Sequence, residues 1–126
     1  MNQVIGIVDC YVMHDISSPI VFQRLIAPQF GMPVDEAAIA AAIPGAKVCV
    51  AEVARLMGEG RYLVGEAVSL ADLMLAPHLT WLPESAEGRE ILAPYPTLGA
   101  WIDRMNARPS MIATTWERMK AMAVAA

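Results

Sequence analysis

The side chains of this 126-residue chain that could support chemistry are two cysteines, two histidines and one closely spaced pair of serine and aspartate. Cys10 and His14 are four residues apart, so on a helix they would share one face and could provide two metal ligands. Two ligands do not complete a site, and we predict no metal centre. A nucleophilic triad needs a histidine with a serine or cysteine partner, and the sequence gives neither His14 nor His78 a recognisable one. We therefore predict no catalytic residue, and we interpret Cys10 and Cys49 as reduced core thiols.

Ser69 and Asp72 form the most specific local pattern in the chain. With Ser69 as N-cap, its hydroxyl can accept from the amide of residue 72, and the Asp72 carboxylate can accept from the amide of Ser69. This arrangement is a capping box. A carboxylate in the first turn of a helix is also favoured by the helix dipole, so we assign both residues a structural role.

Glycines and prolines divide the chain into segments of helical length. The first segment covers about residues 2–30 and places Val4, Val8, Tyr11 and Val12 at helical spacing, although its β-branched residues would also suit a strand. Pro19 should kink or break this segment. It is apolar nearly all round, which is typical of a helix that is buried on more than one side.

The second segment begins after Asp35, a good N-cap, and runs to Met57, where Gly58 supplies a stop signal. Pro44 and Gly45 lie inside it and predict a kink or two abutting helices.

Three further helices are expected. The first starts at Ser69, and the residues that follow at helical spacing are Leu70, Leu73, Met74, Pro77, His78 and Trp81, with a bend expected at Pro77. Another starts at Pro96, with Leu98, Trp101, Ile102 and Met105 on its apolar stripe, and a last one follows Pro109. The prediction is an all-α, compact bundle of about five to six helices, forming one domain over residues 1–126.

Composition limits the partners. The net charge is −4 and the nine Lys and Arg residues are scattered, so we expect no nucleic-acid binding and surface roles for Arg24, Arg61, Arg89, Arg104 and Arg108. No apolar stretch reaches the roughly 18 to 20 residues that span a bilayer. The N-terminus does not resemble a secretory signal, because no basic residues precede its apolar stretch. We therefore expect no membrane insertion and a cytoplasmic location. Because 56% of residues are hydrophobic and only 17% charged, we expect part of the apolar surface to meet another chain, as in a homodimer joined through the first helix.

Several motifs together resemble the C-terminal domain of the glutathione transferase superfamily. Residues 62–72 contain Leu63-x-Gly65 followed, after a five-residue gap, by Ala71-Asp72, a pattern found at the central helix of that domain. The resemblance extends over the whole chain, because the remaining motifs fall in the family's order: Pro94-Tyr95-Pro96, Trp101 and Met105-Asn106-Ala107-Arg108-Pro109.

The resemblance implies a division of labour. In this family a thioredoxin-like domain that precedes the helical domain binds glutathione and carries the residue that activates its thiol, while the helical domain supplies most of the pocket for a hydrophobic electrophile. The chain begins where the first helix of the helical domain would begin, so we expect the thioredoxin-like domain to be missing from it. Tyr11, His14 and Asp15 match the region that faces the active-site cleft in related transferases, and Trp81 could join them as a substrate-binding residue. Core aromatics at Tyr11 and Trp81, with solvent-facing His14 and Asp15, are the competing interpretation.

Three functional hypotheses follow. The chain could be the substrate-binding half of a glutathione transferase, inactive alone and without a cofactor of its own, with glutathione the co-substrate of the intact parent. Helical domains of this type are also attached to translation factors and synthetases, so a non-enzymatic association module is the second hypothesis. An independent small-molecule binder is the third, and it would need a closed apolar pocket within the chain.

Overall fold

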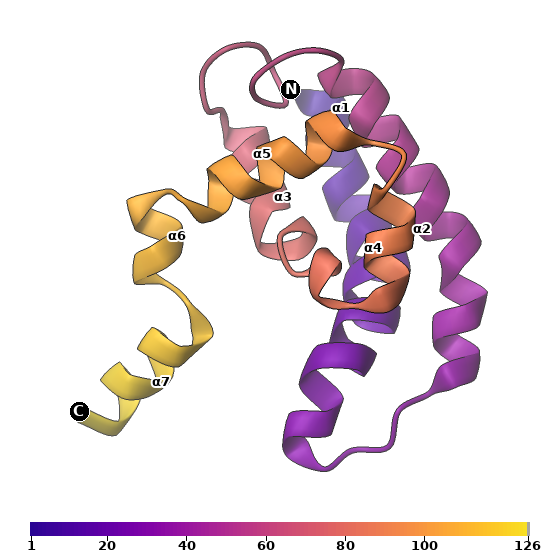
Figure 1. Cartoon of the computed structure of the whole chain (residues 1–126), viewed down its shortest axis with the longest axis vertical. Helices are drawn as coiled ribbons and strands as arrows, with labels where there is room; N and C mark the ends of the chain where they lie inside the picture. Colours follow the sequence, from indigo (N-terminus) through magenta and orange to yellow (C-terminus); the bar gives the residue numbers. More distant parts are fainter. Residues whose placement is uncertain (126) are drawn as a thin grey trace.

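Two long helical segments run side by side along one edge of the molecule and support the rest (Figure 1). The computed structural model describes residues 1–125. The first segment comprises α1 (Asn2–Ile7) and the π-helix η1 (Val8–Ile26), followed by the 3-10 turn η2 (Ala27–Phe30). The second is α2 (Glu36–Met57). The helical interpretation of residues 2–30 is therefore confirmed, and the strand alternative is wrong.

Pro19, Pro44 and Pro77 lie inside their helices without ending them. A proline ring collides with the preceding turn of an α-helix, and around Pro19 the chain is wound as a π-helix, whose turns are wider. Pro44 lies within α2, which continues unbroken to Met57. The predicted caps of α2 are confirmed, because the Asp35 side chain accepts from the Ala38 amide at 2.9 Å and Gly58 ends the helix with a positive φ of 57°.

The remaining helices follow in chain order. They are α3 (Leu70–Leu79), the 3-10 turn η3 (Leu82–Glu84), α4 (Ala86–Leu92), α5 (Pro96–Asn106), α6 (Pro109–Ala113) and α7 (Trp116–Ala125). The all-α prediction is confirmed for the described residues. The helices outnumber the prediction because α4 was not foreseen and because the segment after Pro109 divides into α6 and α7.

The core lies where η1, α2, α3 and α5 meet. Its largest fully buried side chains include Ile16 and Ile20 of η1, Leu75 of α3, and Leu98 and Trp101 of α5. The predicted stripe of α5 is confirmed, since Leu98, Trp101, Ile102 and Met105 are all buried.

The residues that follow Ser69 at helical spacing do not form the buried face of α3. This helix buries Ala71, Asp72, Leu75, Ala76 and Leu79, whereas Leu70 and Leu73 are 54% and 47% exposed. The reason is that α3 packs against α1, η1 and α5 at once, and its small alanines allow these close contacts.

Cys10 is exposed, so its assignment to the core is wrong, whereas Cys49 is buried.

Both long segments, Asn2–Phe30 and Glu36–Met57, are long and apolar enough to cross a membrane by length and composition alone. This differs from the expectation that no stretch would qualify. Core helices of soluble bundles pass the same test, and here each segment buries one face, through Val12 and Ile16 in η1 and through Val50 and Val53 in α2.

Helices α6 and α7 form an arm that stands away from the body of the bundle (Figure 1). Neither helix contains a buried residue. An opening lies between the arm and the end of α3, and residues of both line it.

Candidate functional site

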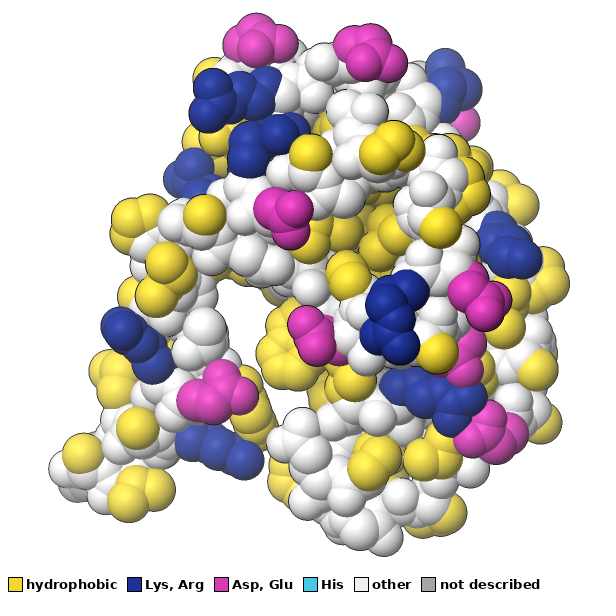
Figure 2. Space-filling view, viewed as in Figure 1, with side chains coloured by type: hydrophobic (Ala, Val, Ile, Leu, Met, Phe, Trp, Pro, Cys, Tyr) yellow, Lys and Arg dark blue, Asp and Glu magenta, His cyan; other side chains and the backbone are white. Residues whose placement is uncertain are grey.

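The opening between the arm and the body is a cavity of about 470 Å³. Figure 2 shows it as a gap beside the arm. Leu25, Gln29, Pro77 and Trp81 line it on the body side, and Met111 and Trp116 line it on the arm side. A concave, partly apolar space of this size lies within the range of pockets that bind small molecules. A smaller apolar cavity of about 120 Å³ adjoins it and shares Gln29, Trp81 and Trp116 with it.

Trp81 is placed by the end of α3. The Thr80 hydroxyl donates to the Ala76 carbonyl at 2.7 Å and closes the last turn of the helix. The next residue after Trp81, Leu82, is fully buried and anchors η3. Trp81 is therefore held between two fixed points and remains half-buried, with its ring available to the cavity.

The wall beyond Trp81 is fixed by the start of α4. Ser85 is the N-cap, and its hydroxyl accepts from the Gly88 amide at 3.0 Å while donating to the Leu82 carbonyl at 2.9 Å. Gly88 lies so close to η3 that a Cβ built on it would be 1.8 Å from the Leu82 oxygen. Only glycine permits this contact.

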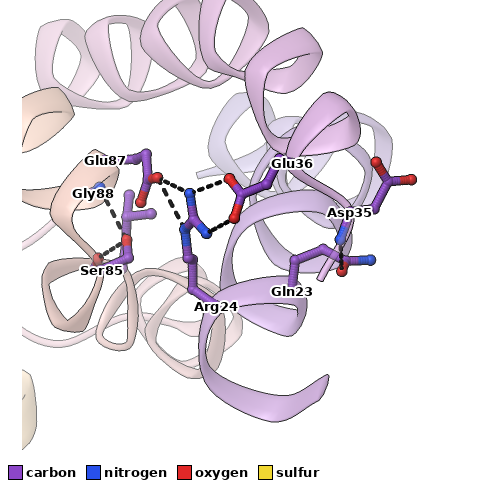
Figure 3. Close-up of polar contacts among 8 residues, drawn as sticks. Gln23, Arg24, Asp35, Glu36, Ser85, Glu87 and Gly88 are labelled. Carbon is purple, nitrogen blue, oxygen red and sulfur yellow. Dashed lines mark hydrogen bonds and ion pairs between the residues drawn. The ribbon is translucent and has the colours of Figure 1, made fainter. Parts of the chain in front are cut away.

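Arg24 of η1 is bonded to residues of both α2 and α4 (Figure 3). Its Nη1 and Nη2 donate to the two carboxylate oxygens of Glu36 at 2.6 and 2.8 Å, and its Nε donates to Glu87 Oε1 at 2.9 Å, with a further short contact from Nη2 to that oxygen. Hydrogen bonds to Arg24 lower the pKa of both Glu36 and Glu87. Arg24 therefore does more than the surface role expected for it, because its ion pairs join η1 to α2 and α4.

The residues predicted to join Trp81 lie elsewhere. Tyr11 is 57% exposed, and neither cavity beside Trp81 includes it. His14 and Asp15 line a different, open groove of about 620 Å³ between η1 and α2. The structure therefore does not bring these three residues together with Trp81 in one cavity.

Asp15 takes part in the packing of η1 on α2. A Cβ built on Gly45 would be only 3.0 to 3.2 Å from the Asp15 carboxyl atoms, so Gly45 makes room for that side chain. Asp15 Oδ1 also lies 3.0 Å from Nδ1 of His14, whose side chain is 88% exposed. The carboxylate is therefore packed at a helix interface, and the imidazole faces solvent.

The structure reveals one pairing that sequence reasoning missed. Ser17 Oγ and His78 Nδ1 are 2.9 Å apart and join η1 to α3. Burial lowers the pKa of His78, which favours the neutral imidazole. Sixty-one positions separate the two residues, so no local pattern could have revealed the contact. Neither residue lines a cavity beside Trp81.

The capping box of α3 is present. Asp72 Oδ2 accepts from both the amide and the hydroxyl of Ser69 at 2.7 Å, and Oδ1 accepts from the Leu63 amide at 2.9 Å and from Trp101 Nε1 at 2.7 Å. Burial opposes ionisation of Asp72, but these hydrogen bonds outweigh it and lower the pKa of the carboxyl group. Its role is structural, as predicted, and broader than a cap.

Within residues 1–125, no group of three or more His, Cys, Asp or Glu side chains is arranged to hold a metal ion. Cys49 lies in the core, and burial raises the pKa of its thiol to about 11, which leaves it protonated at neutral pH.

Comparison with known proteins identifies relatives of this architecture. Residues 7–109 match the family described as glutathione S-transferase, C-terminal domain. Glutathione S-transferase F14 of Arabidopsis thaliana is 29% identical over 105 residues, covering 79% of this chain and 40% of that protein.

Solved structures share the fold. The apo form of glutathione S-transferase III superposes with a TM-score of 0.77 at 24% identity, over 90% of this chain and 51% of the other. A glutathione S-transferase from Rhodospirillum rubrum gives 0.70 at 20% identity, over 89% of this chain and 50% of the other. The chain thus spans less than half of the curated relative and about half of each solved structure.

Proposed function

Because the chain belongs to the family of glutathione S-transferase C-terminal domains, we propose that it forms the electrophile-binding half of a glutathione transferase-like protein. In this proposal the glutathione-binding part lies outside these 126 residues, and the helical chain holds the hydrophobic substrate beside Trp81. Glutathione is then the co-substrate of the whole protein, and the chain alone is not catalytic. We further propose that the protein is a cytoplasmic homodimer and that residues 1–126 act as one domain.

The observation that carries the proposal is the cavity between the arm and the body. Its walls combine the apolar surfaces of Leu25, Pro77, Met111 and the two tryptophans with a few polar groups. A site of this composition favours an apolar molecule that carries some polar substituents, as many electrophiles do. The cavity is open rather than enclosed, which favours the substrate-binding half over an independent binder.

Binding can be tested by titrating the isotopically (¹⁵N) labelled chain with dinitrobenzene, an unreactive analogue of chlorodinitrobenzene. An unreactive probe is needed because chlorodinitrobenzene would arylate the exposed Cys10 thiol, with loss of chloride. The three tryptophans provide separate indole N–H signals in a proton–nitrogen correlation spectrum. We expect the signals of Trp81 and Trp116 to shift on titration, while that of Trp101, which is buried and bonded to Asp72, stays in place.

A matched pair of variants sharpens this test. Trp81→Leu should abolish the shift at Trp116, whereas Val124→Ala, at an 89% exposed position on the same arm, should leave it unchanged. Loss of binding in both variants, or equal shifts of all three indoles, would contradict the assignment of the cavity.

Catalysis is tested separately. A glutathione thiol with an ordinary pKa of about 8.5 is mostly protonated at neutral pH, and holding only one of two reactants gives little rate advantage. We therefore expect the purified chain to conjugate glutathione to chlorodinitrobenzene no faster than the uncatalysed background. Glutathione-dependent turnover that disappears on changing Tyr11 or His14 would instead place the catalytic machinery in the helical chain.

A further inference from the structure

The smaller cavity beside Trp81 is bounded by three aromatic rings. Phe30 of η2, Trp81 after α3 and Trp116 of α7 surround its volume of about 120 Å³, together with Ile26 and Gln29. The faces of aromatic rings carry negative quadrupole charge and attract cations, most strongly for tryptophan. We propose that this aromatic cavity binds the alkylated ammonium group of a small organic cation.

The charged residues that line the two adjoining cavities are both acidic. Of the residues that line the two adjoining cavities, the only charged ones are Glu84 and Glu117. Neither carboxylate takes part in an ion pair within the described residues. A cation held beside the aromatic rings would therefore have two acidic groups in the adjoining larger cavity, and an anion of the same shape would be repelled.

Trp116 already accepts a cation in this structure. Lys120 Nζ lies 5.2 Å from the centroid of the Trp116 ring, a distance typical of a cation–π contact. Lys120 comes from the following turn of α7 and does not line either cavity. It is thus an internal competitor: its charge reduces the attraction of the site for a second cation, and its removal should strengthen binding.

This inference rests on the proposed function, because it specifies the class of molecule that the site beside Trp81 accepts. The electrophile would carry a permanently cationic substituent, such as a quaternary ammonium group, seated against Phe30, Trp81 and Trp116. Its apolar remainder would lie in the larger cavity. Dinitrobenzene therefore tests whether the site binds a neutral aromatic molecule, and choline tests whether the same site prefers a cation.

Three compounds of nearly the same shape separate charge from size. Choline is the cation. Neohexyl alcohol, in which a carbon atom replaces the nitrogen of choline, is its neutral isostere, and tert-butylacetate, the carboxylate anion of tert-butylacetic acid, is an anion of similar bulk. Each is titrated into the nitrogen-labelled chain, and the Trp81 and Trp116 indole signals are followed with Trp101 as the internal control. We expect choline to bind at least about fivefold more tightly than neohexyl alcohol, and tert-butylacetate to bind most weakly.

Variants give the expected pattern a second test. Glu117→Gln should reduce the preference for choline over neohexyl alcohol, and Lys120→Met should increase it, because the two substitutions remove charges of opposite sign from one exposed helix. Trp116→Leu should remove choline binding while the Trp101 signal, which reports the intact core, remains in place.

The outcomes are distinguishable. Equal affinity for choline and neohexyl alcohol would overturn the inference and leave an apolar electrophile site. Dinitrobenzene shifts without choline shifts would also overturn it while supporting the proposed function. Choline shifts without dinitrobenzene shifts would support the cation site and contradict the assignment of a neutral electrophile to the cavity.

Discussion

Asp72 shows how much of the fold depends on one carboxylate. Its oxygens accept from two backbone amides, one hydroxyl and one indole, and they join α3 to the preceding loop and to α5. Replacing Asp72 by Ala leaves buried donors without partners, including the Leu63 amide and the Trp101 indole. We predict a loss of about 3 kcal/mol in the free energy of unfolding, measured by urea denaturation.

Ser69→Ala is the matched control for this prediction. It removes one hydroxyl and leaves the contacts of Asp72 with Leu63 and Trp101 intact, so it should cost about 1 kcal/mol. Equal losses for the two variants would mean that the links to the loop and to α5 contribute nothing beyond the cap.

The same carboxylate makes stability depend on pH. Because the pKa of Asp72 is lower in the folded chain than its ordinary value of about 3.9, its contribution is fully present above that value and is lost as the pH falls through the folded pKa. We predict that Asp72→Asn is less stable at neutral pH and loses less stability than the parent chain on acidification below about pH 4. The pKa values of Glu36, Glu52 and Glu87 are also lowered, so part of the acid dependence should remain in the variant. Parallel curves of unfolding free energy against pH would show that Asp72 is not the group involved.

At the scale of an element, α4 can lie against η3 only because Gly88 has no side chain. A Cβ there would meet the Leu82 backbone oxygen at 1.8 Å, and neither backbone can move away without opening the core. We predict that Gly88→Ala lowers the free energy of unfolding by about 3 kcal/mol. Gly99→Ala in α5 is the control, because nothing lies within 4 Å of its added Cβ. That variant should gain about 0.5 to 1 kcal/mol from helix propensity, and a loss at Gly99 as large as that at Gly88 would refute the steric explanation.

The position of η1 relative to α2 and α4 depends on Arg24. Its side chain is 27% exposed and that of Glu87 only 18%, so Arg24→Met leaves a largely buried carboxylate without its partner. We predict a loss of about 1 to 2 kcal/mol in thermal or urea unfolding, together with weaker ligand binding beside Leu25. Arg55→Met is the control, because Arg55 forms an equally well-aligned pair with Glu52 within a single exposed helix face. Arg55→Met should leave both stability and ligand binding unchanged. A loss of stability as large as that of Arg24→Met would mean that an ion pair between helices contributes no more than one within a single helix.

At the scale of the whole molecule, apolar side chains remain on the surface of the first helical segment. Tyr11 and Met13 are 57% and 51% exposed. We predict that the chain self-associates at tens of micromolar in sedimentation experiments and that the double variant Tyr11→Glu, Met13→Glu is a monomer. Val124→Glu, on the arm, should associate as the parent does. A monomeric parent chain, or association that is unaffected by the double variant, would show that Tyr11 and Met13 do not form the self-association interface.

The sequence by itself determined the features that local chemistry controls. Asp35 and Gly58 delimit α2, Ser69 and Asp72 start α3, and the apolar spacing after Pro96 gives the buried face of α5. Each depends on residues within a few positions of one another, where side chains and amides meet regardless of the rest of the fold. The motifs that resemble the glutathione transferase domain lie in these same stretches.

Only the tertiary structure decided which faces are buried and which side chains share a cavity. Leu70 and Leu73 follow Ser69 at helical spacing, yet packing on three sides buries the face of α3 with Ala71 and Ala76 and leaves the two leucines exposed. Trp81 shares its cavities with Leu25, Gln29 and Trp116 rather than with Tyr11, His14 and Asp15, because the arm that follows Pro109 places Trp116 at the same cavities. Contacts between residues far apart in the chain depend on how whole helices pack, and a single sequence carries no local signal for them.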